Sequence, residues 1–381
     1  GAARVLAGAA AEAGAGPFEL TNRANVQLRG LPDGAVPVVR DALVTAGIVP
    51  PDAGADERRN VLASPTAGVD TDELVDTRPL VTAVADRLAS ARCTGLSPKF
   101  GVLVDGGGAV HVRGRKHDVA FGALRADGAV RYEVRFAEPL PLAHRPDEMV
   151  SIAEPERVLE VIDSAIAGEH VSSALEHLAG NDLALPIRVA SVPAVGVQPQ
   201  KQPERVWVGA VPLLGRLDAE MLAGLADLAT RAGDGDLRIT PWRGVVLTGI
   251  TDVDAARVVG ACERLGFVCD ADHPANVVVA CAGARGCAAG FVDTQADARS
   301  IIDRLAAVPV SRRPGSIHVS GCDKGCARPQ PAEVSLVGGP VDGTYDVYVE
   351  RPESDGRFGA RVETRLDPQR AIDVAAGDPS P

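Results

Sequence analysis

The spacing of apolar residues predicts the same series of elements at two places in the chain. Residues 4–13 and 221–232 are rich in alanine and leucine, a composition typical of helices. Each segment is followed by glycine-containing turns and by alternating apolar positions, in "LTNRANVQLRGL" (20–31) and "ITPWRGVVLTGI" (239–250). Alternation of this kind is typical of strands. Both places therefore predict a helix, a turn and a strand in that order.

A constant offset of 219 residues aligns the two places position by position. The matches include threonine, valine, leucine and glycine, which an alanine-rich sequence does not bring into register by chance. The identical pairs are Thr21 and Thr240, Val26 and Val245, Leu28 and Leu247, and Gly30 and Gly249. We interpret the match as an internal duplication. Each copy continues into a further strand, which begins at an Asn-Val pair at 60–61 and at 276–277.

Three more elements follow from the pattern. A strand at 205–220 precedes the second copy, and its counterpart would lie before residue 1. We therefore expect the first half to lack that strand and to have an unpaired sheet edge. The segment "FGVLVDGGGAVHVRG" (100–114) predicts a β-hairpin with its turn at 106–108, and residues 155–178 predict a helix.

Composition and charge exclude several classes of protein. At 381 residues the chain exceeds what one hydrophobic core usually supports, so at least two domains are expected. Aromatic residues make up only 3% of the chain, so its core must consist mainly of alanine, valine and leucine. A net charge of -12 argues against nucleic-acid binding, and no apolar run is long enough to span a membrane. Seven cysteines, an odd number, do not indicate a secreted disulfide scaffold, and we expect a cytoplasmic protein.

Four of the cysteines form two motifs, Cys281 and Cys287 in "CAGARGC" and Cys322 and Cys326 in "GCDKGC". Four thiolates can bind zinc or a [4Fe–4S] cluster. The wide first spacing and the glycines beside the cysteines favour the cluster, since glycine lets the backbone approach a bulky cofactor. Zinc and buried thiols remain alternatives. The other cysteines are expected to be small core residues: Cys93, Cys262 and Cys269.

With these motifs, the duplication and "LTNRANVQLRG", the chain resembles the nitrite/sulfite reductase superfamily up to about residue 350. The resemblance implies an α+β, internally duplicated nitrite/sulfite reductase-like fold with two ferredoxin-like halves plus two larger α+β domains. The implied divisions are 1–52 for the first ferredoxin-like half, 53–190 for the first α+β domain, 191–204 for a linker, 205–268 for the second half, 269–352 for the second α+β domain with the cluster cysteines, and 353–381 for a tail.

The resemblance also implies a site. Arg23 in "TNRANVQ" and Arg59 in "RRNVLASP" match two anion-binding arginines of the superfamily, and Lys99 in "PKFG" matches the first of two lysines. We predict these three residues to be catalytic. Gly101 replaces the second lysine, which argues against reduction of sulfite or nitrite because a cationic proton donor is missing. The predicted substrate-binding residues are Arg23, Gln27, Arg29, Arg59, Lys99 and Lys324.

Arg23, Arg29, Arg59 and Lys99 lie in motifs of a protein that is otherwise acidic. Such cations could bind a large anionic ligand, for example a tetrapyrrole with carboxylates around its ring. Other arginines are interpreted as solvated surface charges, namely Arg58, Arg113 and Arg115. Within the superfamily, "KFGVLVDGGG", "ITPWRGVV" and "HVSGCDKGCARP" are more similar to an oxygen-dependent branch than to the reductases. That branch hydroxylates C20 of precorrin-3A with O2 and closes a γ-lactone in cobalamin synthesis.

The resemblance implies two cofactors, a [4Fe–4S] cluster on Cys281, Cys287, Cys322 and Cys326 and a second iron centre, either non-haem iron or sirohaem. Cys326 matches the residue that bridges cluster and sirohaem in reductases, and His318 is interpreted as structural rather than as an iron ligand. The sequence contains no nucleotide-binding fingerprint, so an external ferredoxin or flavoprotein reductase is expected as electron donor. Three functions stay open: the monooxygenase, a sirohaem-dependent sulfite or nitrite reductase, and a non-enzymatic metal-stabilised binding protein.

Overall fold

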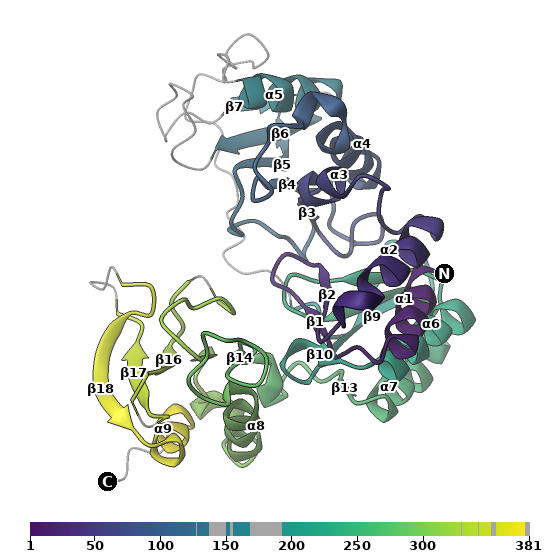
Figure 1. Ribbon diagram of the computed structural model, residues 1–381. Helices are drawn as coiled ribbons and strands as arrows, with labels where there is room; N and C mark the ends of the chain where they lie inside the picture. The colour runs from purple at the N-terminus through teal and green to yellow at the C-terminus, as the bar shows by residue number, and fades with distance from the viewer. Residues whose placement is uncertain are drawn as a thin grey trace.

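The computed structural model describes residues 1–126, 128–136, 150–152, 155–167, 193–328, 330–341, 343–351 and 356–377. These residues form three lobes (Figure 1). One lobe contains both ferredoxin-like halves, and each of the others is built on one five-stranded sheet. The fold is thus the predicted α+β arrangement. None of the described helices is long and apolar enough to cross a membrane.

The two ferredoxin-like halves confirm the predicted duplication, because their elements follow one another at the same offset. The first half consists of α1 (Ala2–Glu12), β1 (Phe18–Leu20), β2 (Val26–Leu28) and α2 (Val36–Thr45). The second consists of α6 (Ala219–Ala232), β11 (Leu237–Ile239), β12 (Val245–Thr251) and α7 (Ala255–Arg264). Asp218 caps α6 by accepting a hydrogen bond from the Met221 amide at 2.8 Å, which stabilises the start of that helix.

The two halves share one core. Helix α1 packs on α6, and the small side chains Ala7 and Ala10 allow this close approach. Strand β10 (Arg216–Leu217) pairs with β1 and so joins the second half to the sheet of the first. Strand β9 (Arg205–Pro212) pairs with β12, β13 (Phe267–Val268) and β8 (Gly196–Pro199). In the described chain β2 has β1 as its only strand partner, so the expected unpaired edge is present.

The five-stranded sheets of the other two lobes have the same topology, so the duplication extends to the larger units. The first sheet contains β3 (Val61–Ala63), β4 (Val102–Asp105), β5 (Val119–Ala126), β6 (Ala129–Phe136) and β7 (Val150–Ile152). The second contains β14 (Val278–Ala280), β15 (Ile317–Ser320), β16 (Val334–Gly338), β17 (Tyr345–Val349) and β18 (Ala360–Leu366). In each sheet the first three strands are parallel to one another, and each of the last two strands runs antiparallel to the strand before it.

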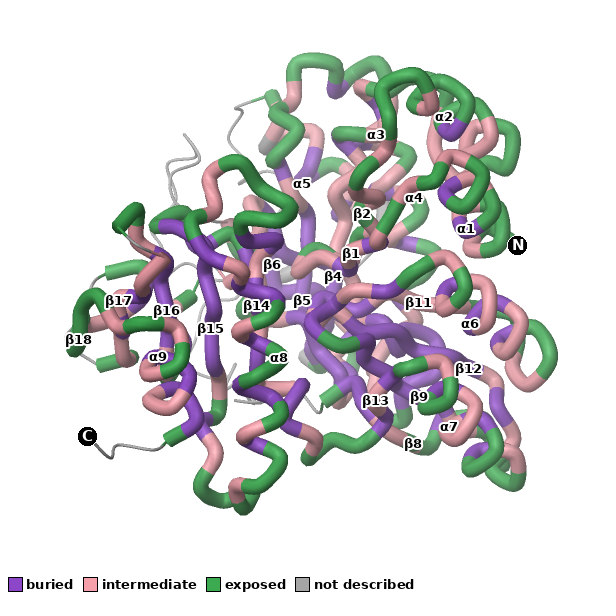
Figure 2. Tube along the Cα trace, turned by 60° about the horizontal axis from the view of Figure 1, so that its bottom comes forward, coloured by how far each residue is buried: buried purple, intermediate pink, exposed green. Residues whose placement is uncertain are grey.

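Helices cover one face of each of these two sheets. The first sheet packs on α4 (Arg78–Ala89) and α5 (Pro155–Ala167), and α3 (Ala53–Arg58) packs on α4. The second packs on α8 (Thr294–Leu305) and α9 (Pro368–Ala375). Strand β15 is buried along its whole length, whereas β18 is an exposed edge (Figure 2). The segment after residue 352, which the sequence leaves as an unassigned tail, therefore contributes β18 and α9 to this unit.

The predicted hairpin at 100–114 is wrong. Strand β4 runs parallel to β5, and the glycines after it belong to a loop that connects two parallel strands. The reason is the buried carboxylate of Asp105, which accepts hydrogen bonds from the amides of Gly107 and Val112 at 3.0 and 2.9 Å. These bonds fold the loop back onto the end of β4. The helix predicted at 155–178 is α5 as far as Ala167, and its remainder lies outside the described residues.

Candidate functional site

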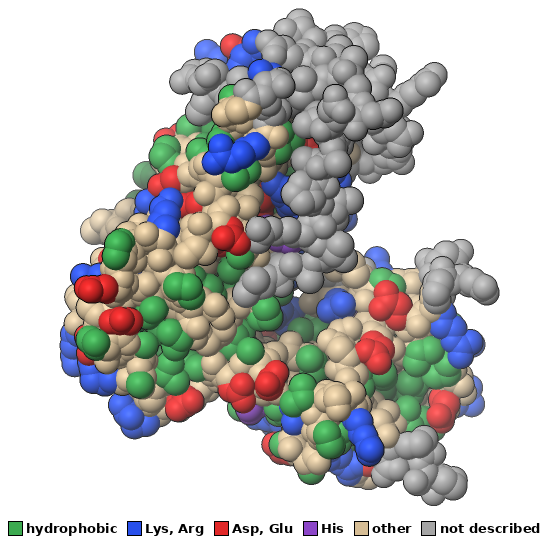
Figure 3. Space-filling model, turned by 180° about the vertical axis from the view of Figure 1, so that it is seen from behind, with side chains coloured by type: hydrophobic (Ala, Val, Ile, Leu, Met, Phe, Trp, Pro, Cys, Tyr) green, Lys and Arg blue, Asp and Glu red, His purple; other side chains and the backbone are tan. Residues whose placement is uncertain are grey.

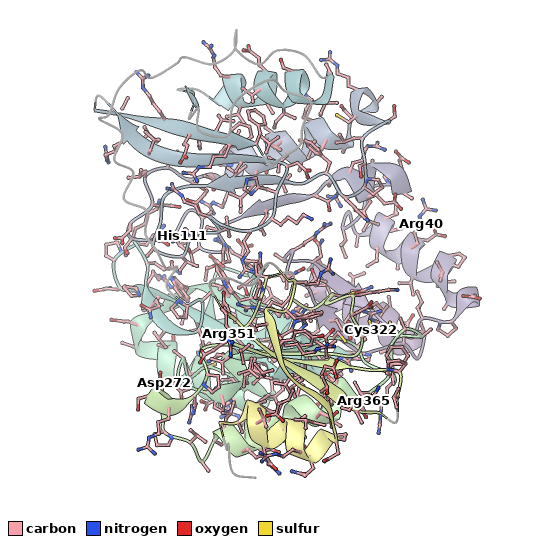
Figure 4. The ribbon with its side chains drawn as sticks, turned by 90° about the vertical axis from the view of Figure 1, so that its left-hand side faces the viewer. Arg40, His111, Asp272, Cys322, Arg351 and Arg365 are labelled. Carbon is pink, nitrogen blue, oxygen red and sulfur yellow. The ribbon has the colours of Figure 1, made fainter. Side chains whose placement is uncertain are left out.

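The four motif cysteines lie around one cavity. Cys281 directly follows β14 and Cys322 lies two residues after β15. Because β14 and β15 are neighbouring parallel strands, their carboxyl ends lie at the same edge of the sheet. Cys281, Cys287, Cys322 and Cys326 all line a cavity of about 370 Å³ at this edge. Figure 4 shows Cys322 near the boundary between the C-terminal sheet and the N-terminal segment.

Hydrogen bonds hold the cysteine loops in place. The Gly321 amide donates to the Cys281 sulfur at 3.2 Å, and Thr294 and Gln295 both donate to the Cys281 carbonyl at 2.8 Å. A Cβ at position 321 would lie 3.4 Å from that sulfur and 3.3 Å from the Cα of Gly283. Glycine at 321 therefore lets the two loops approach each other and donate to sulfur.

The donor set fits an iron–sulfur cluster. All four thiols are free, and they surround one cavity. Within the described ranges, no three cysteine, histidine or carboxylate side chains converge on a point where one metal ion would sit. A [4Fe–4S] cube takes four thiolate ligands from loops that surround it, which is the arrangement of these four cysteines.

A second cavity, of about 420 Å³, adjoins the first and is basic. Its lining includes five cations: Arg23, Arg59, Lys99, Arg115 and Lys116. Cys326 and the turn residues Asn22, Arg23 and Asn25 line both cavities. The two spaces therefore meet at Cys326 and at this turn. The surface is hollowed where the lobes meet (Figure 3).

Charges in the basic cavity are only partly neutralised. Arg59 donates to Asp56 at 2.5 Å and to the Ile48 carbonyl at 3.4 Å. In the part of the chain that the structure describes, the side chains of Arg23, Lys99 and Lys116 have no ion-pair partner. A concave surface with unpaired cations attracts anions.

The structure brings together most of the predicted site residues. Arg23, Arg59 and Lys99 line the basic cavity, as does Gly101. Gln27, Arg29 and Lys324 line the cysteine cavity, together with Arg23. Arg29 is paired there, since Glu19 accepts from its Nε at 2.9 Å and also from Arg216 Nε at 2.9 Å. The catalytic and binding roles of these residues stay predictions.

The interpretation of three arginines as solvated surface charges is wrong. Arg58 is buried, and its Nε donates to the Leu88 carbonyl at 3.3 Å. Arg113 bonds the buried Asp105 at 3.0 Å. Arg115 lines the basic cavity, and its guanidinium lies 5.1 Å from the centre of the Trp242 ring. Burial, with a smaller contribution from nearby Arg328, lowers the pKa of Arg115.

Sequence reasoning missed several other residues at the two cavities. His117 lines the basic cavity, and its Nδ1 lies 2.6 Å from the Arg115 carbonyl oxygen. A carbonyl can only accept, so Nδ1 carries the proton and Nε2 of the neutral ring has the free lone pair. The run of basic residues in "VRGRKH" was the available signal. Arg243 lines the cysteine cavity, and the sequence offers no signal for its contacts.

His318 lies outside the lining of both cavities. It is fully buried on β15, with its ring centroid 5.7 Å from that of Phe358. Burial, and then the nearby charges of Arg328 and Arg243, lowers the pKa of His318 to about 3. Neither ring nitrogen has a hydrogen-bond partner among the described residues. His318 is therefore a neutral residue beneath the site.

Comparisons with known proteins show which family the chain resembles. The model of the nitrite/sulfite reductase ferredoxin-like half domain matches residues 2–46 and 198–265, one segment in each half. A ferredoxin–nitrite reductase of Synechococcus elongatus is 30% identical over 360 residues, covering 85% of this chain and 70% of the relative. A precorrin-3B synthase of a Sinorhizobium species is 28% identical over 352 residues, covering 88% and 73%.

A solved structure shows the same fold. The NirA protein of Mycobacterium tuberculosis superposes with a TM-score of 0.76 at 21% identity, covering 98% of this chain and 77% of that one. Together these matches define the class of protein. The chain belongs to the nitrite/sulfite reductase family. The relatives from Synechococcus elongatus and Sinorhizobium are both enzymes.

Proposed function

We propose that this chain is a precorrin-3B synthase, an O2-dependent monooxygenase that hydroxylates C20 of precorrin-3A with γ-lactone formation. One observation carries the proposal. Position 101 in the basic cavity, where the resemblance predicts a lysine for reduction of a small anion, is glycine. The similarity to the Sinorhizobium precorrin-3B synthase supports the same assignment.

Space at position 101 supports this interpretation. A Cβ there would meet no atom closer than 3.9 Å, so packing does not require glycine at this position. The Gly101 amide donates to Asp118 at 2.8 Å, which holds the carboxylate at the wall of the cavity. A cavity without the lysine has more room for a ring system and one fewer donor for a small oxyanion.

The remaining cations suit a polycarboxylate substrate. Arg23, Lys99 and Lys116 would each bind a carboxylate, and a charge-assisted hydrogen bond contributes about 1.5–3 kcal/mol. Three such bonds from different elements would fix the orientation of a macrocycle in the cavity. The guanidinium of Arg59 is held by Asp56, so we propose that Arg59 helps to orient the substrate and does not bind one of its carboxylates.

Hydroxylation of a C–H bond by O2 consumes two electrons and two protons and releases one water. Cys281, Cys287, Cys322 and Cys326 would hold a [4Fe–4S] cluster, which supplies one-electron transfer when bound. We propose a second iron centre, non-haem iron or sirohaem, and an external ferredoxin or flavoprotein reductase as the source of electrons. His117 would relay protons through Nε2, whose lone pair first accepts a proton from water and then passes it on, in place of the lysine that is missing at position 101.

A second candidate is a sirohaem-dependent nitrite or sulfite reductase. The observation in its favour is the 30% identity to the ferredoxin–nitrite reductase, together with the presence of Arg23, Arg59 and Lys99 in one cavity.

The test uses protein purified without oxygen and a chemical reductant. Incubation with precorrin-3A under ¹⁸O2 should give a product that contains one ¹⁸O atom, with no turnover of nitrite or sulfite. Reduction of nitrite or sulfite with no labelled product would overturn the proposal in favour of the second candidate. The absorption spectrum before assay distinguishes sirohaem from non-haem iron.

A further inference from the structure

Arg243 connects the two cysteine motifs. Its Nη1 donates to the Ala280 carbonyl at 3.1 Å and its Nη2 to the Ala327 carbonyl at 2.9 Å. Ala280 directly precedes Cys281, and Ala327 directly follows Cys326. A single planar guanidinium therefore spans the loop of the first cysteine and the loop of the last.

The backbone around Arg243 is arranged to present this side chain. Arg243 has a positive φ of 62°, which is uncommon for a residue with a side chain. Thr240 closes the turn with two hydrogen bonds to Gly244. The Thr240 amide donates to the Gly244 carbonyl at 2.9 Å, and the Thr240 hydroxyl accepts from the Gly244 amide at 3.0 Å. Gly215 makes room for the stem, because a Cβ there would lie 3.0 Å from the Arg243 Cβ.

The charge of Arg243 lies beside the thiols. Burial opposes its charged form, Glu19 and then Cys281 favour that form, and the neighbouring Arg216 opposes it. Burial is the largest of these effects and lowers the pKa of Arg243. Guanidinium stays protonated in proteins, so a fixed positive charge faces the cavity that the four cysteines line.

We infer that Arg243 is a positioning residue for an iron–sulfur cluster, one that sets the separation of the Cys281 and Cys326 loops and stabilises their thiolates. This inference rests on the cluster assignment and is independent of the substrate. A buried cation beside a cluster also favours its more reduced, more negative form. The residue therefore has two separable effects, one on cluster retention and one on reduction potential.

The test compares Arg243→Gln with Arg243→Lys. After reconstitution we expect Arg243→Gln to lose its cluster to a chelator about 10–100 times faster than wild type, the range for groups that orient metal ligands. Its cluster should also have a more negative midpoint potential in an EPR-monitored titration. Arg243→Lys keeps the charge but not the two-carbonyl bridge, so it should lose the cluster quickly while its potential stays close to that of wild type.

Arg238→Gln is the matched control. Arg238 also donates to two carbonyls, those of Pro65 at 3.2 Å and Ala67 at 2.7 Å, but it lines neither cavity. Equal cluster loss in Arg238→Gln and Arg243→Gln would overturn the inference, as would an unchanged potential in Arg243→Gln. Wild-type protein that takes up no iron and sulfide would overturn the cluster assignment and the inference with it. Circular dichroism of the cluster-free variants checks that each one folds.

Discussion

Ala24 and Arg243 occupy the same position in two copies of one turn, with φ angles of 56° and 62°. Both turns are closed in the same way. Thr21 and Thr240 accept from the amides of Asn25 and Gly244 through their hydroxyls, at 3.1 and 3.0 Å. The duplicated turn has therefore kept its backbone while its side chains have diverged.

The divergence divides the site between the two halves. The first turn brings Arg23 to the place where the basic cavity meets the cysteine cavity. The second brings Arg243 to the cysteine loops and Trp242 to the guanidinium of Arg115. The duplicated turn thus contributes two cations, Arg23 for a ligand in the cavity and Arg243 for the loops that would hold a cluster.

Replacement of Cys326 by serine should remove the cluster. Cys326 is exposed and lines both cavities, so its thiolate is available to a cofactor in either. We expect iron and acid-labile sulfide to fall to background in Cys326→Ser, with loss of activity. Cys93→Ser is the control, since Cys93 is buried and lines neither cavity. A full cluster in Cys326→Ser would exclude this residue as a ligand.

Introducing lysine at position 101 should shift the chemistry toward small anions. The open space at Gly101 accommodates a side chain, and an added cationic acid contributes about 100-fold or more to proton-coupled steps. We expect Gly101→Lys to reduce nitrite with dithionite at a rate at least about tenfold above the background seen with wild type and to hydroxylate precorrin-3A more slowly. Gly95→Lys controls for added charge, because Gly95 is exposed and outside both cavities. An unchanged ratio of the two rates would show that position 101 does not determine specificity.

Much of the fold could be predicted from the sequence because the chain repeats itself. The offset that pairs Thr21 with Thr240 also relates β1 to β11 and α2 to α7. The two cysteine motifs likewise predicted one shared site, and the four cysteines line one cavity. In these cases the information is local, carried by residue type and spacing.

Contacts that depend on distant backbone groups could not be predicted. The partners of Arg243 are carbonyls 37 and 84 residues away, and any residue type supplies a carbonyl. Arg58 likewise bonds a carbonyl 30 residues away, which is why it resembled a surface charge in the sequence. The prediction at Asp105 failed for another reason. The glycines that follow it are typical of a hairpin turn, but the buried Asp105 carboxylate accepts from the Gly107 amide and holds the loop in a different path.

His117→Gln tests the proposed proton donor. Glutamine can keep the bond to the Arg115 carbonyl but cannot exchange a proton as imidazole does. We expect kcat to fall about 100-fold with little change in KM, and a larger share of the O2 consumed should give no hydroxylated product. His273→Gln, at a histidine outside both cavities, should behave as wild type. The charged groups that line the cavity with His117 are Arg23, Arg59, Lys99, Arg115, Lys116 and Asp118. A raised KM with unchanged kcat would instead assign His117 to substrate binding.

Buried His318 should make the protein sensitive to acid. The pKa of His318 is lowered from 6.5 to about 3, mainly by burial, so the folded state keeps the ring neutral where the unfolded state binds a proton. Stability from this residue is therefore complete above pH 6.5 and is lost as the pH falls toward 3. Between pH 7 and 4.5 this residue alone should lower the free energy of unfolding by roughly 2–3 kcal/mol.

The variant His318→Phe tests this prediction, because phenylalanine would keep the contact with Phe358 and remove both unpaired nitrogens. Urea denaturation of His318→Phe should accordingly show a smaller loss between the two pH values than wild type or His273→Phe, and an equal loss in all three would assign the acid sensitivity to other groups.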